Sequence, residues 1–128
     1  MNRMRNGFTL IELVVVIVIL GILSAVALPR FVDLSSQAGR AAAQGVAGSI
    51  SSSTSINYAA RKASHGSAIA IGGCATATMS TLLAGGLPAG YTFTGGGTCA
   101  DGQTTTCTVS NNNVTPPQTA SAVIVCVN

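Results

Sequence analysis

The sequence predicts an α+β protein, in which one long N-terminal helix is followed by a small antiparallel β sheet. Leu13–Leu28 contains no charged residue, and 14 of its 16 residues are Val, Ile, Leu or Ala. Apolar residues then recur at spacings of three and four as far as about Ser64, which is typical of an amphipathic helix. Residues 67–128 are rich in Thr and Gly and contain short β-branched segments between turn residues, which predict strands.

The composition excludes several classes of protein. The length of 128 residues suits one domain. Charged residues make up 7% of the chain and hydrophobic residues 48%, and the mean hydropathy is +0.54. Because the apolar residues are concentrated in one segment, a transporter with several spans is excluded. The net charge of +3 comes without a basic cluster, so no nucleic-acid partner is indicated.

The first half of the predicted helix is long enough to cross a membrane. Phe8–Leu28 has 21 residues, which as a helix measure about 31 Å. Arg3 and Arg5 precede it and keep the N-terminus in the cytoplasm. The two ordinary alternatives are a secretory signal peptide, cut near Ala27, and a plain signal anchor. Glu12 fits neither alternative, because a carboxylate within an apolar segment costs several kcal/mol unless it finds a partner.

The second half of the helix is expected to pack on the exported domain. Pro29 should bend or locally open the helix, and Arg61, Lys62, His65 and Gly66 mark its end. Small residues in its middle would allow close approach of a sheet or another helix. A helix over residues 8–64 would be about 85 Å long, which suits an apolar half that leaves the domain and packs against other subunits. The expected buried face consists of Phe31, Leu34, Ala38, Ala42, Val46, Ile50, Ile56 and Ala60.

The remaining elements are short. Prolines predict an irregular loop over Val114–Thr119, and Gly85-Gly86 ends a short helix expected over Thr78–Ala84. Ser67–Ile71 is expected to be extended. Turns are predicted at Asp101-Gly102 and Asn111-Asn112-Asn113. The strands are expected at Tyr91–Thr94, around Thr105–Ser110, and at Ala122–Val127.

The four cysteines, Cys74, Cys99, Cys107 and Cys126, all lie in the exported part, where disulfides persist. An even count supports two bridges, and spacing alone leaves three pairings open. Each closed loop of roughly 20 residues contributes about 3 kcal/mol in the chain-entropy model. Since no pair has CxxC spacing, we expect no zinc site, and we expect no other metal or cofactor.

Enzymatic chemistry is not indicated. His65 is interpreted as a helix-end residue, and Asp101 as part of its turn, so no Ser-His-Asp triad is expected. Asn113-Val114-Thr115 matches a glycosylation acceptor, although such short matches are common by chance.

The segment Gly7-Phe8-Thr9-Leu10-Ile11-Glu12 resembles the class III signal of type IV pilins and the related pseudopilins. The likeness continues to Pro29 and covers roughly the first 35 residues. It combines a short basic leader, Gly before Phe, and Glu four residues after the Phe. The resemblance implies the pilin fold, and it implies that a prepilin peptidase cuts after Gly7 and that Phe8 becomes the N-methylated mature N-terminus. It also implies that Glu12 pairs with the Phe8 amine of a neighbouring subunit and so selects subunit register.

The resemblance further implies a structural role. The chain would be a single-pass bacterial inner-membrane precursor that forms an extracellular helical fibre of identical subunits, for adhesion, motility or related surface functions. Its partners would be the prepilin peptidase, the pilus assembly platform and its motor. The chain would divide into a removed leader (1–7), a polymerisation helix (8–29) with Pro29 at its end, an amphipathic helix half (30–65) and a disulfide-linked β-rich region (66–128). We expect Cys74 to pair with Cys99 and Cys107 with Cys126, the second of which resembles the C-terminal disulfide loop common in this family.

Several alternatives stay open from the sequence. A minor pilin often lacks the register carboxylate, whereas Glu12 is present here. A major pseudopilin of type II secretion typically has acidic calcium-binding loops, which this sequence lacks. A tip adhesin or DNA-uptake subunit should have a basic or aromatic patch, but residues 67–128 contain no Lys or Arg and only two aromatic residues, Tyr91 and Phe93.

Overall fold

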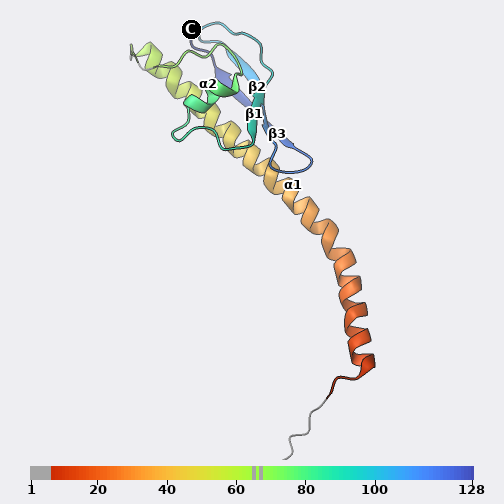
Figure 1. The fold of residues 1–128 in the computed structure, drawn as a ribbon. Helices are drawn as coiled ribbons and strands as arrows, with labels where there is room; N and C mark the ends of the chain where they lie inside the picture. Colours follow the sequence, from red (N-terminus) through yellow and green to blue (C-terminus); the bar gives the residue numbers. More distant parts are fainter. Residues whose placement is uncertain (1–6, 65, 67) are drawn as a thin grey trace, which may run out of the picture. The chain divides into compact units, whose positions relative to one another are not determined.

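The computed structural model describes residues 7–64, 66 and 68–128 (Figure 1). The predictions for the leader up to residue 6, for His65 and for Ser67 lie outside these residues. The chain forms two compact units, Met1–Leu34 and Ser35–Asn128, and helix α1 (Leu10–Lys62) contributes to both. Helix α1 is two residues shorter at each end than the helix predicted over residues 8–64.

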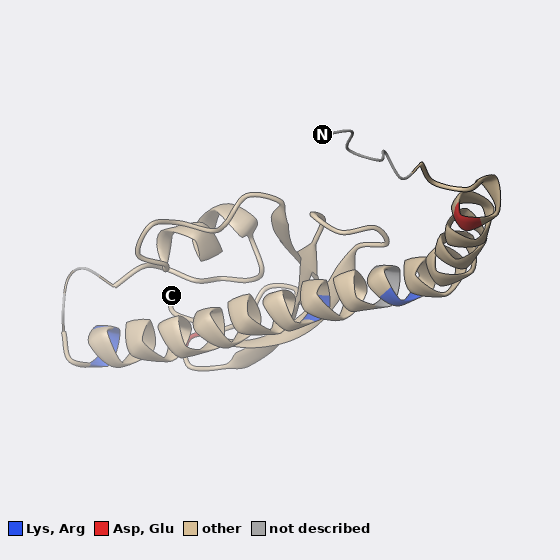
Figure 2. Cartoon of the chain, turned by 90° about the horizontal axis from the view of Figure 1, so that it is seen from below, with Lys and Arg blue, Asp and Glu red and all other residues tan. Residues whose placement is uncertain are grey.

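The first unit contains the apolar part of α1. Among the described residues, α1 is the one helix long and apolar enough to cross a membrane. Its large apolar side chains are exposed throughout, and Pro29 lies within the helix. Charged positions are sparse along α1 (Figure 2). Such continuous apolar exposure indicates a surface that lipid or other chains cover.

The second unit is an α+β arrangement of the pilin type, in which the rest of α1 packs on an antiparallel sheet. The strands β1 (Tyr91–Thr94), β2 (Thr104–Asn111) and β3 (Gln118–Val125) lie in the order β1-β2-β3. Thr94 is opposite Thr108, and Cys107 is opposite Ala122. The predictions of β1 and β2 are therefore confirmed, β2 being one residue longer at each end.

Two predicted boundaries were wrong. Strand β3 begins at Gln118, four residues before the predicted start, and ends at Val125, so the proline loop is shorter than expected. The short helix α2 is Thr76–Thr81, two residues earlier at its start. The hydroxyl of Thr76 accepts a hydrogen bond from the backbone N–H of Phe93 at 2.9 Å, which fixes the helix start beside β1.

Small residues of α1 form the face that packs on the sheet. A Cβ on Gly39 would lie 2.6 Å from Val114 Cγ2, so only glycine fits at this approach. The side chain of Asn111 on β2 donates a hydrogen bond to the Gly39 carbonyl at 3.1 Å. The buried positions on this face are Gly39, Ala43, Ala47, Ile50, Thr54 and Asn57.

Most of the predicted face of α1 was wrong. Ile50 is fully buried and Val46 partly buried, as expected, and Ala60 is also partly buried. The small residues in the middle of the helix do allow a close approach, since Ala43 and Ala47 are buried, but the spacing of apolar residues predicted a face made of other positions. The predicted positions that are exposed are Phe31, Leu34, Ala38, Ala42 and Ile56.

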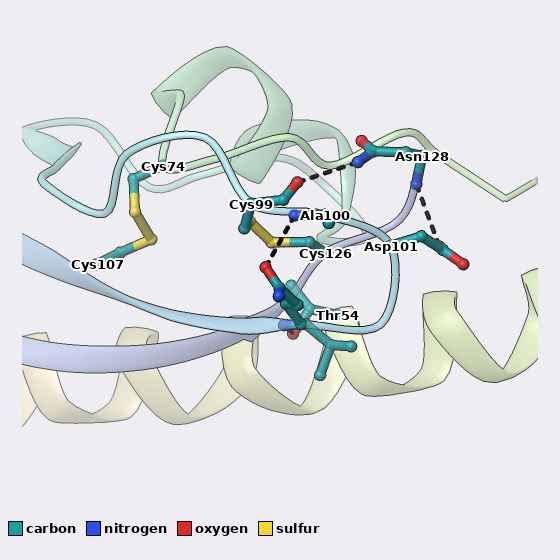
Figure 3. The surroundings of a disulfide bond; sticks show 10 residues. Thr54, Cys74, Cys99, Ala100, Asp101, Cys107, Cys126 and Asn128 are labelled. Atoms are coloured by element: carbon teal, nitrogen blue, oxygen red, sulfur yellow. Dashed lines mark hydrogen bonds between the residues drawn. A yellow bond between two sulfur atoms is a disulfide. The ribbon is translucent and has the colours of Figure 1, made fainter.

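The two disulfides join Cys74 to Cys107 and Cys99 to Cys126, with Cα–Cα distances of 5.6 and 6.0 Å (Figure 3). The expected pairing of Cys74 with Cys99 and of Cys107 with Cys126 was therefore wrong. The register of β2 and β3 gives the reason, because the N–H of Cys126 donates to the carbonyl of Gln103. Cys107 lies four residues further along β2, or about 13 Å away, which is beyond the reach of a disulfide.

Candidate functional site

The site predicted for processing and assembly lies at the start of α1. Gly7, Phe8 and Thr9 precede the helix, and Glu12 is in its first turn. The Phe8 side chain is 86% exposed. The predicted cleavage point after Gly7 therefore lies outside regular secondary structure, and the helix begins three residues later, at Leu10.

Thr9 and Glu12 form a capping box. A Glu12 carboxylate oxygen accepts hydrogen bonds from the Thr9 N–H at 2.9 Å and from the Thr9 hydroxyl at 2.6 Å. The Glu12 N–H in turn donates to the Thr9 hydroxyl at 3.3 Å. This reciprocal pattern satisfies backbone donors that a helix start leaves unpaired. It explains why α1 begins at Leu10 rather than at Phe8.

The sequence interpretation missed Thr9. It treated Glu12 as a charge whose partner lies on another subunit, whereas a local partner lies three residues away. The signal was present, because Thr followed three positions later by Glu before an apolar run is the sequence signature of a capping box. The helix N-terminus also favours a negative charge at this place.

The surroundings of Glu12 are apolar. Phe8, Ile11, Glu12, Val15 and Val16 line a shallow groove of about 320 Å³. A carboxylate has about four lone-pair positions, and Thr9 occupies two, so Glu12 can still accept from an external donor. An apolar groove with one carboxylate suits an apolar segment that carries a positive charge.

Pro29 does not belong to the same site. It lies 17 residues after Glu12 on α1, which corresponds to about 26 Å along a helix. The cysteines lie in the second unit, where they connect loops to β2 and to the end of the chain. The structure thus brings Phe8 and Glu12 together and leaves the other predicted residues elsewhere.

A second polar cluster lies near the end of α1, in the second unit. Lys62 Nζ is 2.7 Å from Asp101 Oδ2, and it lies 5.1 Å from the centre of the Tyr58 ring. The hydrogen bond from Lys62 and that from the Asn128 N–H lower the pKa of Asp101. The hydrogen bond and the charge of Asp101 raise the pKa of Lys62. This exposed cluster ties the helix to the Asp101-Gly102 turn, which the sequence predicted.

The described part of the chain holds no group of three or more His, Cys, Asp or Glu side chains that could bind a metal ion. At the glycosylation-like sequence, the Asn113 amide donates a hydrogen bond to the Ala89 carbonyl at 2.9 Å. That amide nitrogen is therefore engaged in the fold.

A protein-family comparison matches the part of the chain that contains this N-terminal site. Residues 2–28 match the prokaryotic N-terminal methylation motif, so the chain carries a prepilin-type signal. It is 55% identical over 51 residues to the type IV narrow pilus major component PilA5 of Thermus thermophilus, which covers 40% of this chain and 44% of that protein. It is 58% identical over 38 residues to the type IV major pilin protein PilE1 of Neisseria gonorrhoeae, covering 30% of this chain and 23% of that protein.

A fimbrial protein of Neisseria meningitidis shows the same identity over 38 residues, or 22% of its length. The match therefore spans less than half the length of each of these relatives. No solved structure matches this chain. The similarity is to proteins named as pilus or fimbrial components, and the matched methylation motif lies within residues 2–28.

Proposed function

We propose that this chain is the structural subunit of a type IV pilus and polymerises into an extracellular helical fibre. The observation that carries the proposal is Glu12, a carboxylate at the start of an exposed apolar helix, four residues after the Phe8 where the signal predicts cleavage. The relatives named as pilus components support it. The subunit would be stored in the bacterial inner membrane by α1 before assembly.

Processing would give Glu12 its second partner. Cleavage after Gly7 by a prepilin peptidase creates an α-amine on Phe8, which is then N-methylated and remains positively charged. A neighbouring subunit that brings this amine to Glu12 satisfies both charges, whereas a subunit at another height leaves them unpaired in an apolar surrounding. Glu12 would therefore select the register of assembly.

The parts of the chain would then have distinct roles. Residues 1–7 are the leader, residues 8–29 the polymerisation helix that ends with Pro29, and residues 30–65 the half of the helix that supports the β-rich region 66–128. Assembly would use the pilus platform and its motor. The contact between successive subunits would be heterologous, and a heterologous contact whose rotation does not close into a ring generates an open helical polymer.

Mass spectrometry of the mature N-terminus tests the processing step. A subunit that begins with N-methyl-Phe8 is expected in purified fibres. A mature chain that begins near Leu28 would indicate a secreted protein with a signal peptide and would refute the proposal. The number of copies per fibre separates a major subunit from a minor pilin or pseudopilin.

The variant Glu12→Gln tests whether the charge of Glu12 selects the subunit register, and Glu12→Asp is its control. Glutamine keeps the size of the side chain and can still complete the capping box with Thr9, so membrane insertion and the helix start should persist. Removing one member of a buried charge pair costs about 2–5 kcal/mol, so fibre yield should fall at least about tenfold. Glu12→Asp, which keeps the charge, should retain more fibre than Glu12→Gln. Normal fibre yield from Glu12→Gln and Glu12→Val would contradict the role of Glu12.

A further inference from the structure

The two hydrogen bonds that Thr9 donates to the Glu12 side chain end on the same oxygen atom. The Thr9 N–H lies 2.9 Å and the Thr9 hydroxyl 2.6 Å from Glu12 Oε2. Within the described residues, the other oxygen, Oε1, accepts no hydrogen bond. Hydrogen bonds to an ionised group are shorter and about twice as strong as those between neutral groups. One carboxylate oxygen is thus held by the subunit itself, while the other can accept from another donor.

The Thr9 hydroxyl restricts how the Glu12 side chain can turn. It donates to Glu12 Oε2 and accepts from the Glu12 N–H at 3.3 Å, so its donor and an acceptor position are used by the same residue. Threonine is itself restricted at χ1 because it is β-branched. A glutamate that is already fixed in this way loses less rotamer freedom when a partner binds it.

The groove beside these bonds makes the position of the carboxylate important. Glu12 lines the groove together with apolar side chains, namely Phe8, Ile11, Val15 and Val16. A charge in such surroundings is costly unless hydrogen bonds or an opposite charge compensate it. Before a neighbouring subunit arrives, the donors of Thr9 supply part of this compensation from within the same chain.

We propose that Thr9 is a positioning residue for the register step, which holds Glu12 Oε2 so that Oε1 receives the Phe8 amine of the neighbouring subunit. The inference rests on the proposed function as a fibre subunit. Thr9 acts through Glu12 and does not itself bind the amine. The competing explanation is that Thr9 only caps the helix, and a cap requires no donor to Glu12.

Three substitutions of Thr9 separate positioning from capping. Thr9→Ser keeps the cap and the hydroxyl, and Thr9→Val removes both. Thr9→Gly removes the hydroxyl but starts a helix nearly as well as threonine, since glycine is tolerated at the N-cap. If Thr9 only caps the helix, Thr9→Gly should therefore assemble like Thr9→Ser. If Thr9 positions Glu12, Thr9→Gly should assemble as poorly as Thr9→Val.

The measurement is the amount of fibre sheared from cells, checked by electron microscopy. We expect wild-type amounts from Thr9→Ser and about tenfold less from Thr9→Gly and Thr9→Val, because a hydrogen bond to a charged group is lost. In a Glu12→Gln background, Thr9→Gly should reduce the yield no further, because the charge to be positioned is absent. Ser24→Ala is the matched control, since it removes a hydroxyl that bonds the Leu20 carbonyl in the same apolar segment, and it should assemble like the wild type.

The outcomes that would overturn the inference are distinct from those that concern the fibre itself. Mass spectrometry should show N-methyl-Phe8 in every variant, and a Thr9→Gly subunit that stays uncut would place the role of Thr9 in processing instead. Normal fibre yield from Thr9→Gly, or a loss that adds in full to that of Glu12→Gln, would leave only the cap. Absence of wild-type fibres would refute the proposed function, whereas fibres that respond to Glu12→Gln but not to Thr9→Gly would refute only this inference.

Discussion

The crossed disulfides allow a quantitative test of the fold. The cysteines of the two bridges are 33 and 27 residues apart. In the chain-entropy model, these loops contribute about 3.7 and about 3.6 kcal/mol at 25 °C. Because the loops share residues 99–107, the combined value of about 7 kcal/mol is an upper bound. A small domain has a total stability of about 5–15 kcal/mol, so loss of both bridges should leave little of the folded population.

Paired alanine variants identify which cysteines act together. Cys74→Ala, Cys107→Ala and the double variant of these two should each lose about 3–4 kcal/mol of unfolding free energy, because all three lose the same bridge. Cys74→Ala combined with Cys126→Ala breaks both bridges and should lose up to about 7 kcal/mol. The assay is urea unfolding of the full chain in detergent micelles, followed by pulse proteolysis. If the Cys107→Ala, Cys126→Ala pair behaved as a single loss, the described pairing would be refuted.

Peptide mapping without reduction checks the same pairing directly. Residues 63–128 contain no Lys or Arg, so trypsin does not separate the cysteines. Cleavage before Asp101 and after Tyr91 or Phe93 separates Cys74 and Cys99 from the C-terminal peptide. The C-terminal peptide should be linked both to the peptide with Cys74 and to the peptide with Cys99. A further cut near Val114 separates Cys107 from Cys126 and shows which of them each peptide is linked to. A C-terminal peptide linked to neither would refute the described pairing.

Three further predictions concern single contacts. Thr9→Val removes the helix cap, which costs about 1 kcal/mol, so hydrogen exchange at the amides of the first turn of α1 should be about fivefold faster. Thr9→Ser keeps the hydroxyl and should exchange like the wild type. Equal exchange rates in the wild type and both variants would exclude the cap. Asn57, 9% exposed, accepts from the Ile69 N–H at 2.8 Å and donates to its carbonyl at 2.7 Å. Asn57→Leu should therefore lose about 1–3 kcal/mol for each orphaned group in urea unfolding, while exposed Ser52→Leu should change little, and a neutral Asn57→Leu would contradict the reasoning. Asp101 has a lowered pKa and Lys62 a raised one, so the ion pair stabilises the fold fully between the ordinary pKa of an aspartate, about 3.9, and that of a lysine, about 10.4. The difference in urea midpoint between wild type and Asp101→Asn should shrink as the pH falls below about 4 through the lowered pKa of Asp101, and again as the pH rises above about 10.4 through the raised pKa of Lys62; a difference that does not depend on pH would contradict this reasoning.

The sequence predicts the elements that have a strong local signal. The apolar run and its continuation predict α1 to within two residues at each end, and alternating β-branched residues predict β1 and most of β2. Strand β3 starts earlier than predicted, because Gln118–Ser121 has little β-propensity and forms a strand by pairing with β2. Its start is thus decided by tertiary contacts rather than by local sequence.

The remaining errors have a common physical origin. The buried face of α1 depends on which residues let two backbones approach, as at Gly39, and hydrophobic period alone does not show this. The disulfide pairing depends on strand register, which places Cys126 beside Gln103 rather than beside Cys107. At the candidate site, Glu12 was identified by its cost in an apolar segment, while its local partner Thr9 was missed although its signature was present.

The crossing of the two disulfides has a consequence for cleavage of the chain by proteases. The bridges Cys74–Cys107 and Cys99–Cys126 overlap along the chain. A single cut anywhere between Cys74 and Cys126 therefore leaves the two pieces covalently joined. With bridges arranged one after the other, a cut between Cys99 and Cys107 would release the whole C-terminal piece. The overlap makes this part of the chain tolerant of any one broken peptide bond.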